Sequence, residues 1–260
     1  KLIGIDPTGA KFRQYYKPGI ELVPDFFTAA NWQSIAGDAK AKLVTSIAMF
    51  YDLEDPTTFA RDIRSILDDD GVWHFEQSYM PLMLRYNSFD TICHEHASYY
   101  TLRAVKNILD KADLRIIDVR INDINGGSFA VTAVPNGSKR VGNESVVDWM
   151  LEQEQVNGLS TSAPLHAFAG RLATHAAGLR SLLARLADDG RKVIGYGAST
   201  KGNVILQYCR IDSSMISAIA EINPDKFGCV TPGTHIPIIA DADARAMNPD
   251  YFVVLPWHFR

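Results

Sequence analysis

The sequence predicts an α/β protein with two lobes, each built on a parallel sheet, and a helical connector between them. Short β-branched runs alternate with helical stretches over roughly the first 120 residues, a pattern typical of a doubly wound sheet. A long Ala- and Leu-rich segment follows, and a second strand-turn-helix unit opens near residue 191. We therefore expect one domain over residues 1–138, and the connector with a smaller α/β domain over residues 139–260.

The strands expected in the first domain are short and apolar, with helical periodicity between them. They cover residues 1–6, 20–24, 43–49 and 72–77. Residues 114–121 and 128–134 are two further expected strands, separated by a loop too short for a helical crossover. This last pair should therefore be antiparallel.

The second half begins with a helical region over residues 143–189, and helix start signals at 160–164 mark a break in it. The α/β unit that follows is expected to have strands at 192–196, 215–220, 236–239 and 251–255 and a helix at 203–208. Both chain ends have the pattern of core strands. Because buried strands seldom form natural termini, we expect the sequence to be a piece of a longer polypeptide.

Composition limits the classes of function. The chain is 47% hydrophobic and 22% charged, and its net charge of -4 comes without a basic stripe, so a small-molecule ligand is favoured over nucleic acid. The three cysteines are far apart and form no C-x-x-C pair, which favours a reducing cytoplasm. No apolar run approaches the roughly 18 to 20 residues that span a bilayer. We expect a cytoplasmic protein without membrane partners, either a monomer or a weak homo-oligomer.

The densest group of chemically active side chains runs from Asp90 to Tyr100 and includes His94, Glu95 and His96. Three readings compete: a metal site that uses the two histidines, an acid/base centre, and a polar loop whose histidines satisfy backbone groups. An H-x-H pair can bind zinc, but the sequence offers no evident third and fourth ligand. Imidazole titrates near neutral pH and an adjacent carboxylate can orient it, so acid/base chemistry is favoured and no metal is assigned.

Two other segments indicate a nucleotide-like ligand. Asp6 ends the first strand, where ligands of α/β sheets bind, and its carboxylate can accept ribose hydroxyls; a helix-capping Asp is an equal alternative. The turn from Gly195 to Asn203 leads a strand into a helix, a geometry that holds phosphate on backbone amides. Its glycine spacing fits neither the dinucleotide fingerprint nor a Walker loop, and tight packing is the alternative reason for the glycines. Glu221 follows about 20 residues later, where an acid can meet a ribose.

Taken together, these stretches resemble the sugar C-methyltransferase family, which methylates C3 or C5 of nucleotide-linked 4-keto deoxysugars. The matching segments, in family order, are GIDPTG, FYDLEDP, DGVWHFEQSYMP, FDTICHEHASYY, NGGSFAVTA, GYGASTKGNVILQYC, TPGTHIPII and LPWHF. The resemblance implies a class I methyltransferase (Rossmann-like) domain that lacks its first strand, a helical connector, and a second, smaller Rossmann-like domain. It implies zinc only in a family N-terminal domain that is absent from this sequence.

The resemblance also implies roles for the polar residues. His96 is the expected base that removes the proton next to the keto group, with Glu95 beside it, and His94 or Tyr99 is expected near the keto oxygen. The implied cofactor is S-adenosylmethionine, with Asp6 on its ribose and Asp25 and Phe26 flanking its adenine. The implied partner is a nucleotide-linked keto sugar, held by Ala198, Ser199, Thr200, Lys201, Asn203 and Glu221.

Two other functions remain open from the sequence. An NAD-dependent oxidoreductase would use the turn at Gly195 but would leave the His-Glu-His run without a role. In a non-catalytic nucleotide-sugar binding protein, only the second lobe would keep its function, which is binding. Methyl transfer, nicotinamide reduction, or binding without turnover distinguishes the three.

Overall fold

The computed structural model describes residues 1–259, which form two compact units that do not follow chain order. Unit 1 contains residues 1–79, 97–122 and 128–155, whereas unit 2 contains 80–96, 123–127 and the residues from 156 onward. The His-Glu-His run therefore belongs to the same unit as the glycine-rich turn. The predicted domain boundary after residue 138 divides the chain into two continuous segments, whereas each unit combines several segments. This boundary stays a prediction.

Unit 1 opens with a two-stranded parallel sheet of β1 (Leu2–Ile5) and β2 (Ile20–Val23). Helix α1 (Ala29–Ala36) follows β2, and it begins where the Thr28 side chain accepts a hydrogen bond from the Asn31 amide.

A second sheet of unit 1 has four strands in the order β3-β4-β6-β5. The strands are β3 (Ala41–Ile47), β4 (Leu67–Ser78), β5 (Leu114–Asn122) and β6 (Ser128–Pro135). β3 and β4 are parallel, while β6 is antiparallel to both β4 and β5. The antiparallel pair expected at the end of the first domain is thus confirmed.

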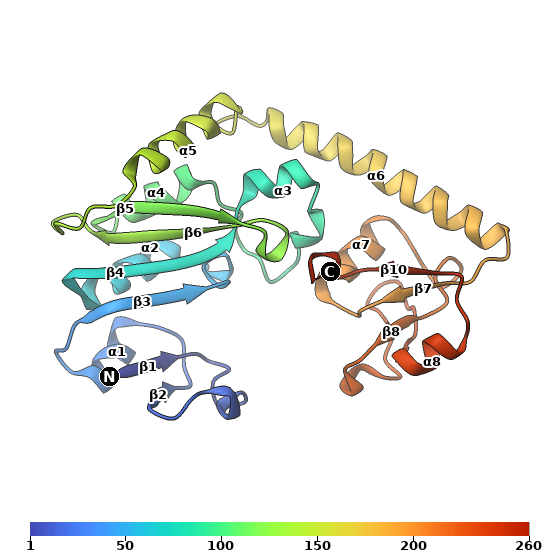
Figure 1. The fold of residues 1–260 in the computed structure, drawn as a ribbon, viewed down its shortest axis with the longest axis horizontal. Coiled ribbons are helices and arrows are strands. Elements are labelled where there is room, and N and C mark those ends of the chain that lie inside the picture. Colours follow the sequence, from blue (N-terminus) through green and yellow to red (C-terminus); the bar gives the residue numbers. More distant parts are fainter. Residues whose placement is uncertain (260) are drawn as a thin grey trace. The chain divides into compact units, whose positions relative to one another are not determined.

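Two helices, α2 (Pro56–Ile66) and α4 (Leu102–Asp110), pack on one face of this sheet (Figure 1). Trp73 and Phe75 belong to that face, since the Phe59 ring of α2 lies 6.0 Å from the Trp73 ring. Both aromatic side chains are fully buried, and Phe50 packs against them with ring centroids 5.6 and 5.3 Å away. Alternation along β4 sends these rings to one face, which is why the apolar helix stripes cover that side.

A buried carboxylate joins three elements of unit 1. Glu154 lies on α5 (Glu144–Val156) and is 4% exposed. Its Oε1 accepts hydrogen bonds from the Tyr79 hydroxyl at 2.8 Å and the Leu102 amide at 2.5 Å, and its Oε2 accepts one from the Arg103 amide at 2.9 Å. Two otherwise unsatisfied amides at the start of α4 are thereby paired.

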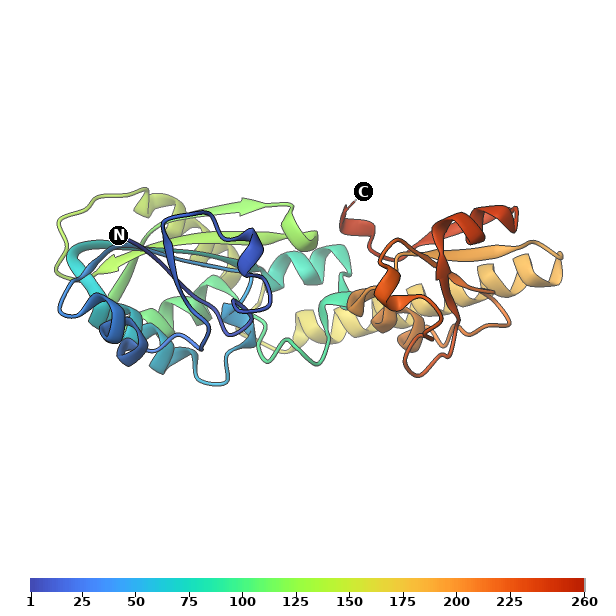
Figure 2. The ribbon, with the colours of Figure 1, turned by 90° about the horizontal axis from the view of Figure 1, so that it is seen from below.

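Unit 2 contains a four-stranded, all-parallel sheet in the order β10-β7-β8-β9. The strands are β7 (Val193–Tyr196), β8 (Ile219–Glu221), β9 (Ile238–Ala240) and β10 (Tyr251–Val254). The helices are α3 (Met80–Tyr86), α6 (Ala163–Asp188), α7 (Thr200–Tyr208) and α8 (Asp241–Ala246). Figure 2 shows α6 lying along β7. Chain order reverses between β7 and β10, which is where ligands of such sheets bind.

The strand expected at residues 215–220 is shorter, because β8 begins only at Ile219. Asp212 holds the preceding residues in a turn: its Oδ1 accepts from the Ser214 amide, and its carbonyl accepts from the amides of Met215 and Ile216. Met215 and Ile216 therefore pack their apolar side chains from a turn and not from a strand. Among residues 1–259, no helix is both long and apolar enough to cross a membrane.

Candidate functional site

Segments far apart in the sequence meet in unit 2. The short helix η3 (Phe89–Thr91), just before the His-Glu-His run, packs on α7, and the Phe89 ring lies 5.1 Å from that of Tyr208. The Trp257 indole donates to Asp90 Oδ2 at 3.0 Å, and Lys201 Nζ donates to the Asn125 carbonyl at 3.5 Å. Four of the sequence segments that we singled out are therefore in one place.

Asp90 is the buried acid of this cluster, with 2% of its surface exposed. Burial raises its pKa, and the Trp257 hydrogen bond and the Lys201 charge act in the opposite direction. A carboxylate is rarely buried this fully unless it is paired. Asp90 had no predicted role, since nothing in a local sequence pattern indicates that residues 90 and 257 meet.

Lys201 stands in the first turn of α7, which the Ser199 side chain caps by accepting from the Gly202 amide at 3.0 Å. Its ammonium is partly buried, and this burial lowers its pKa, while the charges of Asp90 and Cys93 raise it. The ammonium lies 3.5 Å from the Asn125 carbonyl, and Asp90 and Cys93 are near enough for their charges to act on it.

His96 is half-buried, whereas His94 and Glu95 are exposed. Burial lowers the pKa of His96, and the nearby Lys201 charge lowers it further; the Thr91 backbone and Glu95 raise it. The net direction favours the neutral imidazole, which is the form that can accept a proton. Tyr99, which was expected near the keto oxygen, belongs to unit 1.

The glycine-rich turn lies at the carboxyl end of β7. Gly197 has φ of +85°, and a Cβ there would lie 2.6 Å from Pro256 Cγ, so the turn requires glycine. Glu221, at the end of β8, accepts the Ala198 amide at 3.0 Å through Oε2 and the amides of Ile222 and Asn223 through Oε1. The structure thus brings Ala198 and Glu221 together and engages the Ala198 amide within the protein.

A second lysine borders this turn. Lys226 Nζ donates to the Ala198 carbonyl at 2.8 Å and lies 3.5 Å from Glu221 Oε2. The cavity beside it measures about 220 Å³ and is lined by Tyr196, Gly197, Ala198, Ser199, Ala220, Glu221, Ile222, Lys226 and Pro256. Lys226 is not among the residues for which the sequence predicted a role. The signal that could have identified it is a cation five residues after a strand-ending acid.

The residues expected at the cofactor lie together in unit 1. Asp6 and Asp25 follow β1 and β2, and their amides both donate to the Val23 carbonyl, at 3.0 and 2.9 Å. Asp6 accepts from the amide and hydroxyl of Thr8 and from the Tyr16 hydroxyl, each at 2.8 Å. These bonds, led by that of the Thr8 side chain, lower its pKa. Phe26 is 72% exposed.

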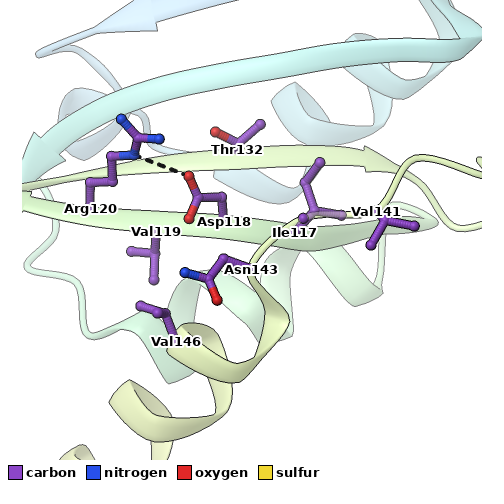
Figure 3. Close-up of a pocket in the computed structure, with 9 residues that line it drawn as sticks. Ile117, Asp118, Val119, Arg120, Thr132, Val141, Asn143 and Val146 are labelled. Atoms are coloured by element: carbon purple, nitrogen blue, oxygen red, sulfur yellow. Dashed lines mark hydrogen bonds and ion pairs between the residues drawn. The ribbon is translucent and has the colours of Figure 1, made fainter.

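A larger hollow of about 600 Å³ lies on the outer face of β5 in unit 1 (Figure 3). It is lined by Ile117, Asp118, Val119, Arg120, Thr132, Val141, Gly142, Asn143 and Val146. Arg120 and Asp118 pair at 3.2 Å beside it, while Val141 is 89% exposed. None of the expected site residues lines this hollow, so we assign it no ligand. Nowhere along residues 1–259 do three or more His, Cys, Asp or Glu side chains form a group suited to a metal ion.

Comparison with known proteins identifies two family models and a curated relative that match this chain. Residues 123–260 match the family model described as the C-methyltransferase C-terminal domain, and residues 2–119 match the one described as a methyltransferase domain. C-methyltransferase NovU of Streptomyces niveus is 31% identical over 260 residues, which are 100% of this chain and 62% of NovU. The chain thus spans less than two thirds of the length of this relative.

Two solved structures resemble the chain over about half its length. A methyltransferase in complex with the Trm112 methyltransferase activator of Haloferax volcanii has a TM-score of 0.41 and 14% identity, over 51% of this chain and 71% of that one. A SAM-dependent methyltransferase from Anabaena variabilis has a TM-score of 0.39 and 13% identity, over 52% and 68% of the two chains. Only residues 120–122 separate the two family matches.

Proposed function

The chain belongs to the C-methyltransferase family, and from that premise we propose that it catalyses S-adenosylmethionine-dependent C-methylation of a nucleotide-linked 4-keto deoxysugar. The observation that carries the proposal is the position of His96. A half-buried imidazole, whose pKa is lowered, lies in the unit that also contains the glycine-rich turn between β7 and α7. A base and a nucleotide site in one unit are what proton abstraction from a nucleotide-linked sugar requires.

The residues of unit 1 fit the proposed cofactor. The lowered pKa of Asp6 keeps it ionised, and an ionised carboxylate has about four acceptor positions. Three of these are used by Thr8 and Tyr16, so one position remains for a ribose hydroxyl. The exposed Phe26 ring beside Asp25 offers an apolar face to an adenine. When bound, S-adenosylmethionine supplies an electrophilic methyl group.

His96 performs the proton transfer in this proposal. Its unprotonated ring nitrogen accepts the proton from the carbon next to the keto group. The C–H electron pair becomes the carbon–carbon double bond of an enolate, and the carbonyl electron pair moves onto the oxygen. The enolate carbon is then the nucleophile, and His96 returns its proton to water. A positioned base of this kind contributes typically about 10² to 10⁴ in rate.

The cavity beside the glycine turn is the proposed nucleotide site. Ser199 lines this cavity and caps α7 by accepting from the Gly202 amide, which leaves the amides of Thr200 and Lys201 as first-turn donors without an intrahelical acceptor. Lys226 adds a positive charge at the same cavity. In this arrangement Glu221 orients the turn through the Ala198 amide and borders the ribose position.

The test is methyl transfer from labelled S-adenosylmethionine to dTDP- and UDP-linked 4-keto-6-deoxy sugars, with wild type and two histidine variants. His96→Asn should lower the rate by about two orders of magnitude or more and leave cofactor and nucleotide-sugar affinity within a few-fold. His166→Asn, on the exposed side of α6, is the matched control and should behave as wild type. Full activity of His96→Asn would refute the role of the base. Nicotinamide reduction or binding without turnover by the wild type would refute the proposed reaction.

A further inference from the structure

The base and the nucleotide cavity leave one group of unit 2 without a function, the buried carboxylate of Asp90 and the partly buried ammonium of Lys201. Neither charge lines the cavity beside the glycine turn, whereas Lys226 does. Lys201 instead contacts the Asn125 carbonyl, and Asp90 is bound by the Trp257 indole. The sequence pattern had placed Lys201 at the diphosphate because it stands in the glycine-rich turn; its side chain leads elsewhere.

We propose that Lys201 binds the keto oxygen of the substrate, and that Asp90 is the positioning residue that holds the Lys201 ammonium in place. This inference rests on the proposed function and assigns two residues within it. The diphosphate charge is then met by Lys226 and the start of α7, so the two lysines serve opposite ends of one substrate.

The position of Lys201 suits an oxygen that gains charge. An ammonium has three N–H donors, and the Asn125 carbonyl takes one, which leaves donors for a substrate oxygen. Lys201 stands in the first turn of α7, which packs against η3 just before the loop of His96, and its charge acts on that ring. Proton removal by His96 and charge development on the keto oxygen occur in one step, so a cation beside the base stabilises the transition state more than the bound ketone.

Asp90 supplies what a partly buried ammonium needs. Burial lowers the pKa of Lys201, and the charge of a nearby carboxylate acts in the opposite direction. The Trp257 indole fixes that carboxylate from the far end of the chain, and Gly126 gives the indole room, since a Cβ there would lie 3.1 Å from the ring. The charge of Asp90 thus offsets part of the effect that burial has on the pKa of Lys201.

Other titratable groups face this pair and belong in any pH study of it. Cys93 acts on Lys201 from the His-Glu-His loop, and Glu95 acts on His96 from the same loop. His258, on the 3₁₀ helix η6 (Trp257–Phe259), feels both Lys201 and Asp90. The variants chosen to test the proposal leave all three unchanged.

The first experiment separates the two lysines in the protein expressed from its complete reading frame. Lys201→Met should lower exchange of the sugar α-proton into deuterated water by about 10²- to 10³-fold, and its affinity for dTDP or UDP, measured by calorimetry, should stay within about threefold. Lys226→Met should show a clear loss of that affinity. Lys106→Met removes an exposed lysine of α4 and is the control for both measurements.

The second experiment tests Asp90 through the pH dependence of the same exchange. Asp90→Asn keeps the shape and an acceptor for Trp257 but removes the charge that raises the pKa of Lys201. Because the donor must be protonated, activity should then be lost at a lower pH on the alkaline side than in wild type. In Lys201→Met, the pKa of His96 should rise, since a charge that lowers it is gone. Histidine ring NMR measures that change without any sugar.

The outcomes distinguish this inference from the function on which it rests. The role of Lys201 is overturned if the wild type exchanges the α-proton and Lys201→Met exchanges it at the same rate. It is also overturned if Lys201→Met binds the nucleotide more weakly than Lys226→Met does. An unchanged alkaline limb in Asp90→Asn overturns the role of Asp90. A wild type that binds nucleotide sugar but neither exchanges the proton nor transfers a methyl group overturns the proposed function and the inference together.

Discussion

Replacement of Glu154 by glutamine should destabilise unit 1 more than any change at the surface of the same helix. The carboxylate accepts hydrogen bonds from Tyr79, Leu102 and Arg103, and glutamine offers only one oxygen to these three donors. In the least costly orientation, the new NH₂ group faces the Arg103 amide, so one charge-assisted bond is lost and two become neutral.

The magnitude follows from these three bonds. A hydrogen bond to a charged group contributes about 1.5–3 kcal/mol, against about 1 kcal/mol for a neutral one. One bond lost and two weakened amount to about 2.5–7 kcal/mol in the free energy of unfolding. With a typical urea dependence of about 1–3 kcal/mol per molar, the midpoint should fall by about 1 M or more.

Urea unfolding followed by circular dichroism measures the change, and hydrogen exchange at the amides of Leu102 and Arg103 locates it. Glu152→Gln is the control, because Glu152 is exposed on the same helix and should cost less than about 0.5 kcal/mol. If Glu154→Gln unfolds within about 0.5 kcal/mol of wild type, the three bonds do not stabilise the native state as argued here.

Two further substitutions test the turn and the cofactor strand. Gly197→Ala combines a left-handed backbone with a contact of 2.6 Å to Pro256 and should cost about 2–5 kcal/mol of stability by urea unfolding, whereas Gly170→Ala on α6 should not destabilise. Asp6→Asn should weaken S-adenosylmethionine binding by about 10- to 100-fold, the effect of losing a charge-assisted hydrogen bond, and calorimetry should find no such loss in Asp38→Asn. Equal affinities of the two Asn variants would remove Asp6 from the cofactor site.

The local elements of the fold could be predicted from the sequence because their signals are local. Alternation and turn residues located the strands of unit 1, and the short loop after residue 121 predicted the antiparallel pair of β5 and β6, which the structure confirms. The start of β8 was wrong by four residues, since Met215 and Ile216 are apolar enough for a strand and only the hydrogen bonds of Asp212 reveal the turn.

The candidate site was less accessible to sequence reasoning, because its connections are long-range. His96 stood out by the density of polar residues around it, but Asp90 and Trp257 gave no local signal of their contact. Lys201 was singled out through its backbone position in the turn. Only the path of its side chain shows that it lies with the His96 loop and not at the cavity of Lys226.

The hydrogen bond between Asp90 and Trp257 also has a consequence for synthesis of the chain. Its two partners are 167 positions apart. At about 5–20 residues per second, a ribosome adds Trp257 roughly 8 to 33 seconds after Asp90. Throughout that interval Asp90 has no indole to accept a hydrogen bond from, so the segment just before the His96 loop lacks this contact. All residues of unit 1, in contrast, have been added once the chain reaches residue 155. The proposed catalytic centre therefore cannot be completed before residue 257 has been added, and in a nascent chain interrupted earlier Asp90 would lack its indole partner.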